Sequence, residues 1–347
     1  MQKRDDSQDM GIYVETDLDP VQALHNEVQR VFETDLYRKT AYRNVVRIHV
    51  RLNPVDPFQW LKQQRFEQRI FWKGRRRLMS IAGIGTADVI RGDRGGIKAL
   101  SAHRKAFTSL GRSRYFGGIR FDAKRPTSRE WESFGSYTFY LPRFELTTSG
   151  DSAHLVCNLV LPRDFAQKQS ILDLIGQIQM PEHNLVGSVD LPESRMYSPE
   201  RETWIKMLHR TLDVLSSDEQ LEKVVMARKV SFAFPEEVDR LLLFKHLCAI
   251  KHNHFQFYFQ PEANVAFMGA SPERLYRRDG RYIESEAVAG TGRRDTSSGA
   301  DLQLADALLG SEKDQREHAF VRESIIRSMK DLCNTMHIDA EASLLEL

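Results

Sequence analysis

The stretch from about residue 44 to residue 160 constrains the fold most, because it consists of short β-type runs separated by glycines. Five such runs are residues 45–50, 70–72, 81–84, 137–141 and 154–161. A helical pattern over 21–33 precedes them, and helical and strand patterns mix from about 198 to 333. A sheet-rich first half followed by a mixed second half predicts an α+β fold with large antiparallel sheets and surrounding helices.

The chain has 347 residues, enough for one large domain or two ordinary ones. We expect residues 1–20 to form a flexible tail and residues 21–195 a sheet-rich N-terminal part. Residues 196–347 form a second part, and we expect both parts to pack as one compact domain.

Composition narrows the class of protein. An apolar content of 41% and a charged content of 28% are typical of a soluble globular enzyme, and a net charge of +2 gives no field that favours nucleic acid. The basic triplet at 75–77 is interpreted as a solvated turn.

Cys157, Cys248 and Cys333 are too few and too far apart for a disulfide framework, which predicts a reducing cytoplasm. No apolar stretch is long enough to span a bilayer, and no secretion signal is visible.

Several elements are expected in the second half, including a helix near 236–250 and strands at 255–260 and 265–269. Ser198 and Pro199 predict the start of a helix that ends near Leu215. A strand led by Lys223 follows it, and Asp279-Gly280 predicts the turn of a hairpin. A single long helix is expected from about Gly299 to Cys333.

Lys223 is the first candidate catalytic residue. It opens the run Lys-Val-Val-Met-Ala-Arg at 223–228, and a lysine at the head of an apolar run suggests that its amine has a function. A desolvated lysine loses its proton more readily and can act as a base. The alternative is a lysine at the end of a strand that keeps its ammonium group in water.

Three further features follow Lys223 in the chain. Glu273 comes directly after Ser271-Pro272 at the end of a predicted strand, where proline fixes the backbone. The segment Ala289-Gly290-Thr291 can turn its backbone amides toward an anion such as a carboxylate, or it is an ordinary flexible turn. Glu317 lies on the apolar stripe of the last helix, where a carboxylate must be paired or bound to a metal ion such as Mg²⁺.

Together these segments resemble the chorismate-utilising enzymes, the family that contains isochorismate synthase and anthranilate synthase component I. The matching text is the 223–228 run, Gly-Ala-Ser-Pro-Glu at 269–273, Glu-Ala-Val-Ala-Gly-Thr at 286–291 and Ser-Glu-Lys-Asp-Gln-Arg-Glu-His at 311–318. The first half resembles the isochorismate synthases in particular, through Phe-Gly-Gly-Ile-Arg-Phe at 116–121 and Leu-Pro-Arg-Phe-Glu-Leu at 141–146. The resemblance covers nearly all of the chain after about residue 40.

The resemblance implies water as the nucleophile, because members that use ammonia carry glutamine in place of Lys223. It implies Lys223 as the base that deprotonates water, Glu273 as the acid that protonates the leaving hydroxyl, and Glu317 as a ligand of Mg²⁺. Ala289, Gly290 and Thr291 would bind the substrate carboxylate. The implied activity is the conversion of chorismate to isochorismate, for menaquinone-type or siderophore synthesis, by a cytoplasmic monomer with no glutaminase subunit, nucleic acid or membrane as partner.

Two alternatives stay open. A salicylate synthase shares the lysine and adds the elimination of pyruvate. The family also continues beyond the helix that ends near Cys333, with a second metal-binding glutamate and a substrate-binding arginine. The resemblance therefore implies that residues 196–347 are the first part of a chorismate-binding catalytic core, truncated relative to the family. A non-catalytic remnant of the family is the second alternative.

Overall fold

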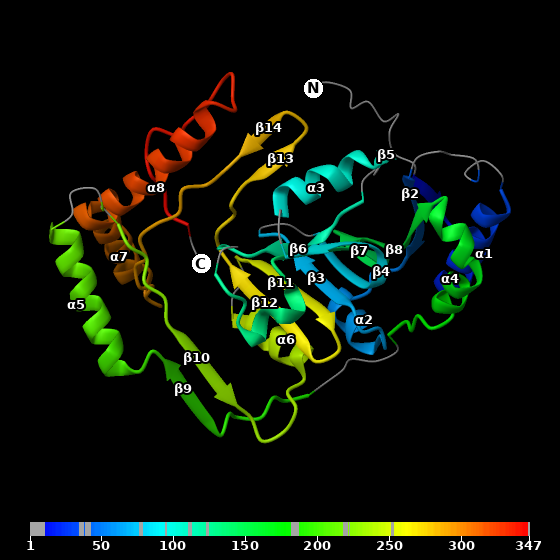
Figure 1. The fold of residues 1–347 in the computed structure, drawn as a ribbon, viewed down its shortest axis with the longest axis horizontal. Helices are drawn as coiled ribbons and strands as arrows, with labels where there is room; N and C mark the ends of the chain where they lie inside the picture. Colours follow the sequence, from blue (N-terminus) through cyan, green and yellow to red (C-terminus); the bar gives the residue numbers. More distant parts are fainter. Residues whose placement is uncertain are drawn as a thin grey trace. The chain divides into compact units, whose positions relative to one another are not determined.

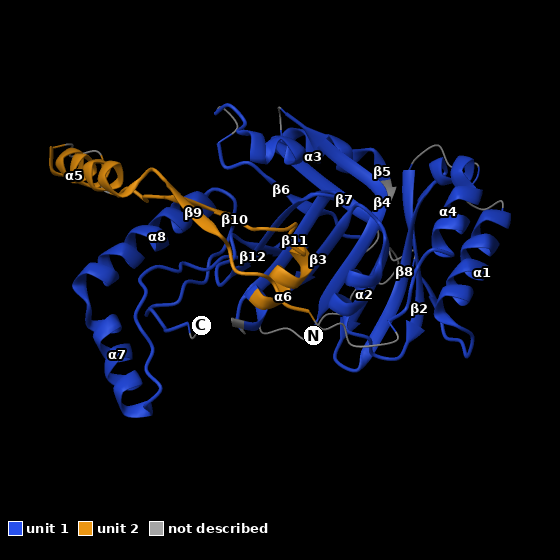
Figure 2. Cartoon of the chain, turned by 90° about the horizontal axis from the view of Figure 1, so that it is seen from below, with its two compact units in different colours: residues 1–184, 247–347 blue, residues 185–246 orange. Residues whose placement is uncertain are grey.

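The fold is described by a computed structural model for residues 11–34, 38, 43–75, 79–93, 96–109, 113–122, 125–181, 187–217, 221, 223–250 and 253–345. These residues form two compact units, the first from residues 1–184 and 247–347 and the second from residues 185–246 (Figure 2). The predicted division near residue 195 stays a prediction.

A ten-stranded sheet organises the first unit (Figure 1). Its main path runs β1-β2-β8-β7-β4-β3-β11-β12, with β5 beside β2 and β6 beside β7. The pairs of β1 and β5 with β2 are parallel, and the other pairs are antiparallel. The strands are β1 (Gly11–Val14), β2 (Arg43–Leu52), β3 (Arg69–Lys73), β4 (Ser80–Gly92), β5 (Phe107–Ser109), β6 (Phe116–Ile119), β7 (Tyr137–Ser149), β8 (Ser152–Leu161), β11 (Phe255–Glu262) and β12 (Val265–Ser271).

All five strand runs predicted in the first half are confirmed, and each is longer in the structure than its pattern. The alternation of apolar and polar residues sets which face of a strand is buried, but the ends depend on hydrogen-bonded neighbours. Residues 11–14 of the predicted tail form β1, because they pair with residues 47–50 of β2. Residues 15–19 of that tail lead into the helix that begins at Pro20, and residues 1–10 lie outside the described residues.

Helices cover the sheet. They are α1 (Pro20–Glu33), α2 (Pro57–Gln63), α3 (Gly96–Lys105) and α4 (Lys168–Ile175), with short 3₁₀ helices η2 (Arg129–Phe134) and η3 (Arg163–Gln167). α1 packs on α4, β2 and β8, whereas α2 packs on β3, β4 and β7 (Figure 2). The side chain of Asp19 caps α1 by accepting hydrogen bonds from the amides of Val21 and Gln22.

A charged network lies inside the sheet's packed core. Arg47 of β2 forms an ion pair with Glu145 of β7 at 3.0 Å, and the two side chains are only 3% and 0% exposed. Asn158 of β8 donates to the Glu145 carboxylate at 2.6 Å. Arg143 donates to Asp164 at 2.5 Å and to the carbonyl of Asn158 at 2.8 Å. Two guanidinium groups therefore balance two carboxylates, as burial of charge requires.

Cys157 of β8 is fully buried, and this burial raises the pKa of its thiol to about 12. The thiol is therefore neutral near pH 8, and a neutral thiol is a poor nucleophile. We expect iodoacetamide at pH 8 to leave Cys157 unmodified in the folded chain and to alkylate it in denaturant, as measured by peptide mass spectrometry. Modification of Cys157 at the rate of the partly exposed Cys333 would contradict this assignment of its burial.

The second unit contains β9 (Ser194–Ser198), α5 (Arg201–Ser217), β10 (Lys229–Ala233) and the first residues of α6 (Arg240–Ile250). The prediction that Ser198 caps the helix is wrong, because Ser198 pairs with Lys229 in the β9–β10 ladder. The predicted strand led by Lys223 is also wrong, because residues 223–228 are irregular and the ladder begins at Lys229. Apolar residues of high strand propensity form a strand only where a partner strand is available.

The remaining elements of the first unit are β13 (Arg277–Asp279), β14 (Tyr282–Glu284), α7 (Ser298–Gly310) and α8 (Glu312–Lys330). The predicted hairpin is confirmed, with Gly280 at its turn in a left-handed conformation (φ 58°). The single long helix is wrong, because Ser311 separates α7 from α8 and its side chain caps α8 by accepting from the amide of Asp314. Serine competes for backbone hydrogen bonds and favours a cap over a helix interior.

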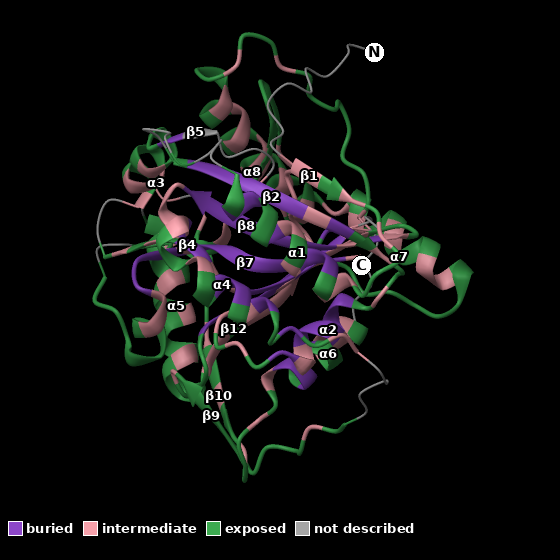
Figure 3. Ribbon diagram, turned by 90° about the vertical axis from the view of Figure 1, so that its right-hand side faces the viewer, coloured by how far each residue is buried: buried purple, intermediate pink, exposed green. Residues whose placement is uncertain are grey.

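Burial is concentrated in β2, β4, β7 and β8, whereas β9, β10, α5, α7 and α8 have no fully buried residue among those described (Figure 3). No helix in the described part of the chain is long and apolar enough to cross a bilayer.

Candidate active site

Glu273 lies in the turn that follows β12, as its sequence context predicts. Its amide donates to the Ser271 hydroxyl at 3.3 Å, and that hydroxyl in turn lies 3.4 Å from the Glu273 carbonyl. Glu273 lines a cavity of about 510 Å³ together with Arg114, Arg274 and side chains of the β13–β14 hairpin. A carboxyl group at the wall of an arginine-rich cavity can meet an anionic ligand and exchange a proton with it.

An ion-pair cluster holds the backbone on both sides of Glu273. Arg75 donates to the carbonyl of Pro272 and makes a two-pronged ion pair with Glu286, at 2.6 and 2.7 Å. Arg274 donates to the same Glu286 carboxylate at 2.9 Å. The interpretation of 75–77 as a solvated turn is wrong for Arg75, whose side chain is only 11% exposed, and residues 76–77 lie outside the described residues. Sequence reasoning missed this contact, because its partners are 211 residues apart.

The segment Ala289-Gly290-Thr291, which we call the glycine segment, begins three residues after Glu286. Gly290 has a φ of 79°, in the region that favours glycine, and a Cβ atom there would lie 3.2 Å from the Cβ of Asp314 on α8. The absence of a side chain therefore lets the segment approach α8 closely. Ala289 and Gly290 are half-buried, whereas Thr291 is exposed.

Glu317 lies on α8, near the contacts that join this helix to the glycine segment. Asp314, one turn earlier, meets Gly290, and the His318 ring nitrogen Nε2 lies 3.2 Å from the carbonyl oxygen of Ala287. The structure thus links three predicted sites through contacts of residues that neighbour them in the chain. Glu273 is joined through Arg274 and Glu286 to the glycine segment, and that segment packs on the helix that carries Glu317.

Carboxylates on this helix are the candidate ligands of a metal ion. Within the described ranges no group of three or more histidine, cysteine, aspartate or glutamate side chains is arranged to hold one. Mg²⁺ needs only one or two carboxylates when substrate oxygens and water complete its octahedron. The half-buried Glu317 fits that requirement as a single protein ligand.

Lys223 belongs to the second unit, and it is half-buried, whereas Val224 and Val225 next to it are exposed. The segment 223–228 is held at its last residue within that unit. Arg228 donates to the carbonyl of Pro199 at 2.8 Å and stacks over the ring of Tyr197. Glu273, Gly290, Thr291 and Glu317 belong to the first unit. The roles of Lys223 as base and Glu273 as acid, which the resemblance implies, stay predictions.

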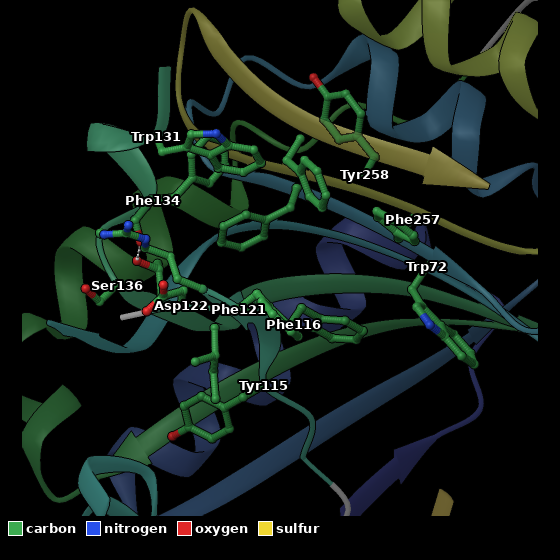
Figure 4. A pocket seen from close by; sticks show the side chains of 18 of the residues that line it. Trp72, Tyr115, Phe116, Phe121, Asp122, Trp131, Phe134, Ser136, Phe257 and Tyr258 are labelled. Carbon is green, nitrogen blue, oxygen red and sulfur yellow. Dashed lines mark hydrogen bonds between the residues drawn. The ribbon is translucent and has the colours of Figure 1, made fainter. Parts of the chain in front are cut away.

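A larger cavity of about 1260 Å³ lies beside the first and shares Trp72, Met79 and Arg114 with it. Its wall is rich in aromatic side chains, with Trp131 and Phe134 among the rings around it (Figure 4). None of the site residues predicted from the sequence lines it. We therefore place the candidate site at the smaller cavity, which contains Glu273.

Comparison with known proteins identifies the family. The sequence model of the chorismate binding enzymes matches residues 27–347. The chain belongs to this family. The resemblance inferred from the four motifs is thereby confirmed.

Among relatives of this chain, the chloroplastic isochorismate synthase of Catharanthus roseus is 30% identical over 282 residues, which are 78% of this chain and 48% of that protein. The isochorismate synthase MenF of Escherichia coli (strain K12) is 25% identical over 298 residues, which are 82% of this chain and 61% of that protein. The chain thus spans about half the length of the curated relatives it matches.

The fold is shared with a solved structure of MenF, the menaquinone-specific isochorismate synthase from Escherichia coli. The TM-score is 0.73 at 22% identity, over 90% of this chain and 69% of that chain. The predicted α+β fold of the chorismate-utilising enzymes is therefore confirmed.

Proposed function

We propose that this chain belongs to an isochorismate synthase, which adds water at C2 of chorismate and removes the C4 hydroxyl group. The observation that carries the proposal is the linked arrangement of Glu273, the glycine segment and α8. The names of the relatives support it, since the plant and bacterial proteins above are isochorismate synthases. A menaquinone-type or siderophore pathway would use the product.

In the proposed reaction Lys223 accepts a proton from a water molecule whose oxygen forms the new bond to C2. The ring double bonds shift, the C4–oxygen bond breaks, and Glu273 supplies the proton with which the hydroxyl leaves as water. One proton is taken up by the base and one is released by the acid, so the reaction is balanced. The base must begin neutral and the acid protonated, which requires that the surroundings of the two groups differ.

The glycine segment and Glu317 serve substrate binding in this proposal. The amides of Gly290 and Thr291 would hold the ring carboxylate, and Ala289 leaves no nucleophilic side chain beside them. Mg²⁺, held by Glu317, would supply positive charge that offsets the ring carboxylate. Water is the nucleophile, so no glutaminase subunit is required, and we propose a cytoplasmic monomer.

The test is to incubate the purified chain with chorismate and Mg²⁺ and to separate the products by liquid chromatography. Isochorismate supports the proposal. Salicylate together with pyruvate would instead identify a salicylate synthase. Failure to bind or convert chorismate in the presence of Mg²⁺ would overturn the proposed activity for this chain.

A further inference from the structure

We propose that Arg75 and Glu286 are positioning residues that fix the backbone around Glu273 for proton transfer. This inference rests on the proposed role of Glu273 as the acid. We define the clamp as the ion-pair cluster of Arg75, Glu286 and Arg274. It joins the β3–β4 connection to the turn after β12 and to Glu286, which lies three residues before the glycine segment.

The turn that carries Glu273 has little restraint of its own. Its internal hydrogen bonds, between Ser271 and Glu273, are long at 3.3 and 3.4 Å. The strand before it, β12, is the last on the described path of the sheet, where its one neighbour is β11. A group that transfers a proton must be held within about 0.5 Å of its productive position, which such a turn does not ensure.

The clamp supplies that restraint from both sides of Glu273. Arg75 holds residue 272 through its carbonyl and reaches the carboxylate of Glu286 with a second part of the same guanidinium group. Arg274, the residue after Glu273, donates to that same carboxylate at 2.9 Å and to Glu284 at 2.6 Å. The backbone on either side of the proposed acid is therefore tied to one anion, Glu286.

The geometry requires arginine at position 75. Its planar group makes three directed hydrogen bonds, and its carbon Cζ also lies 5.3 Å from the centre of the Phe255 ring. A lysine could keep the charge, but it has one nitrogen and could not reach Pro272 and Glu286 through two separate nitrogens as Arg75 does. The side chains of Arg75 and Glu286 are 11% and 23% exposed, so solvent weakens their ion pair less than it does a surface pair.

The clamp is tested with Arg75→Gln, Arg75→Lys and Glu286→Gln, each made alone and together with Glu273→Gln. Arg51→Gln is the matched control, because Arg51 forms an exposed ion pair with Glu15 at 3.0 Å. We expect Arg75→Gln to lower kcat for isochorismate formation about 100-fold, with KM for chorismate within about 3-fold of wild type. Arg75→Lys should recover part of the loss. In the Glu273→Gln background the same substitution should change the residual rate less than about 3-fold, since the clamp acts through that carboxyl group.

Amide hydrogen exchange provides a readout that does not depend on activity. We expect Arg75→Gln to accelerate exchange in peptides that cover residues 270–276 and 284–288, and to leave peptides from β7 and β8 unchanged. If the wild-type chain does not convert chorismate, the proposed function fails. Faster amide exchange around Glu273 in the Arg75→Gln variant would still show that the clamp restrains this backbone. Equal loss of rate in both backgrounds, or unchanged exchange around Glu273, would overturn the positioning role.

Discussion

Replacing Lys223 with alanine is expected to lower kcat for isochorismate formation by about 10²–10⁴-fold, the usual contribution of a general base. The Kd for chorismate should stay near that of wild type, because the proposed binding groups, Gly290, Thr291 and Glu317, are unchanged. The measurement is product formation by liquid chromatography, combined with calorimetric titration of chorismate in the presence of Mg²⁺.

Lys206→Ala is the matched control, since Lys206 is an exposed lysine of α5 in the same compact unit. It should change neither kcat nor Kd. Unchanged turnover in the Lys223 variant would refute its assignment as the base. A large loss of binding with little change in kcat would assign Lys223 to substrate binding instead.

Glu145→Gln is expected to destabilise the chain by about 3 kcal/mol, the lower end of the range for breaking a buried ion pair. Glutamine has nearly the same shape as glutamate, so the loss comes from the charge of Arg47, which would stay 3% exposed and without its carboxylate. Asn158 would also lose its charged acceptor. Urea unfolding followed by circular dichroism measures the change in the free energy of unfolding.

Glu15→Gln breaks the exposed pair with Arg51 and should leave the free energy of unfolding within about 0.5 kcal/mol of wild type. The double variant Arg47→Met with Glu145→Leu removes both charges and should recover much of the stability lost by Glu145→Gln. A single variant as stable as Glu15→Gln would show that the Arg47–Glu145 pair is not buried as described.

The spacing of apolar residues predicted the elements whose structure depends on neighbouring residues in the chain. The β-type runs between 44 and 160 are strands, and the periodic segment at 21–33 is α1. The run after Lys223 has equal strand propensity but is irregular, because no partner strand pairs with it among the described residues. The helical stripe across Ser311 is continuous, yet the serine side chain caps a new helix there.

The residues of the candidate site likewise include some that the local sequence indicates and some that it does not. Glu273 and Gly290 could be found because a proline and glycines mark unusual backbone positions. Arg75 could not be found in this way, because a run of three basic residues is typical of a solvent-exposed turn. Its anionic partner, Glu286, follows 211 residues later in the chain. Contacts of this kind are set by the order of strands in the sheet, which a local pattern does not encode.

The pairing of β3 with β11 has a consequence for biosynthesis. About 180 residues separate these neighbours along the chain. At a translation speed of about 5–20 residues per second, the outer edge of β3 waits roughly 10–40 s on the ribosome before its partner is made. An unpaired strand edge is a template for association with other chains. We expect the edge at Trp72 and its neighbours to need a temporary cover, from a chaperone or from another segment of the chain, until residue 262 has emerged.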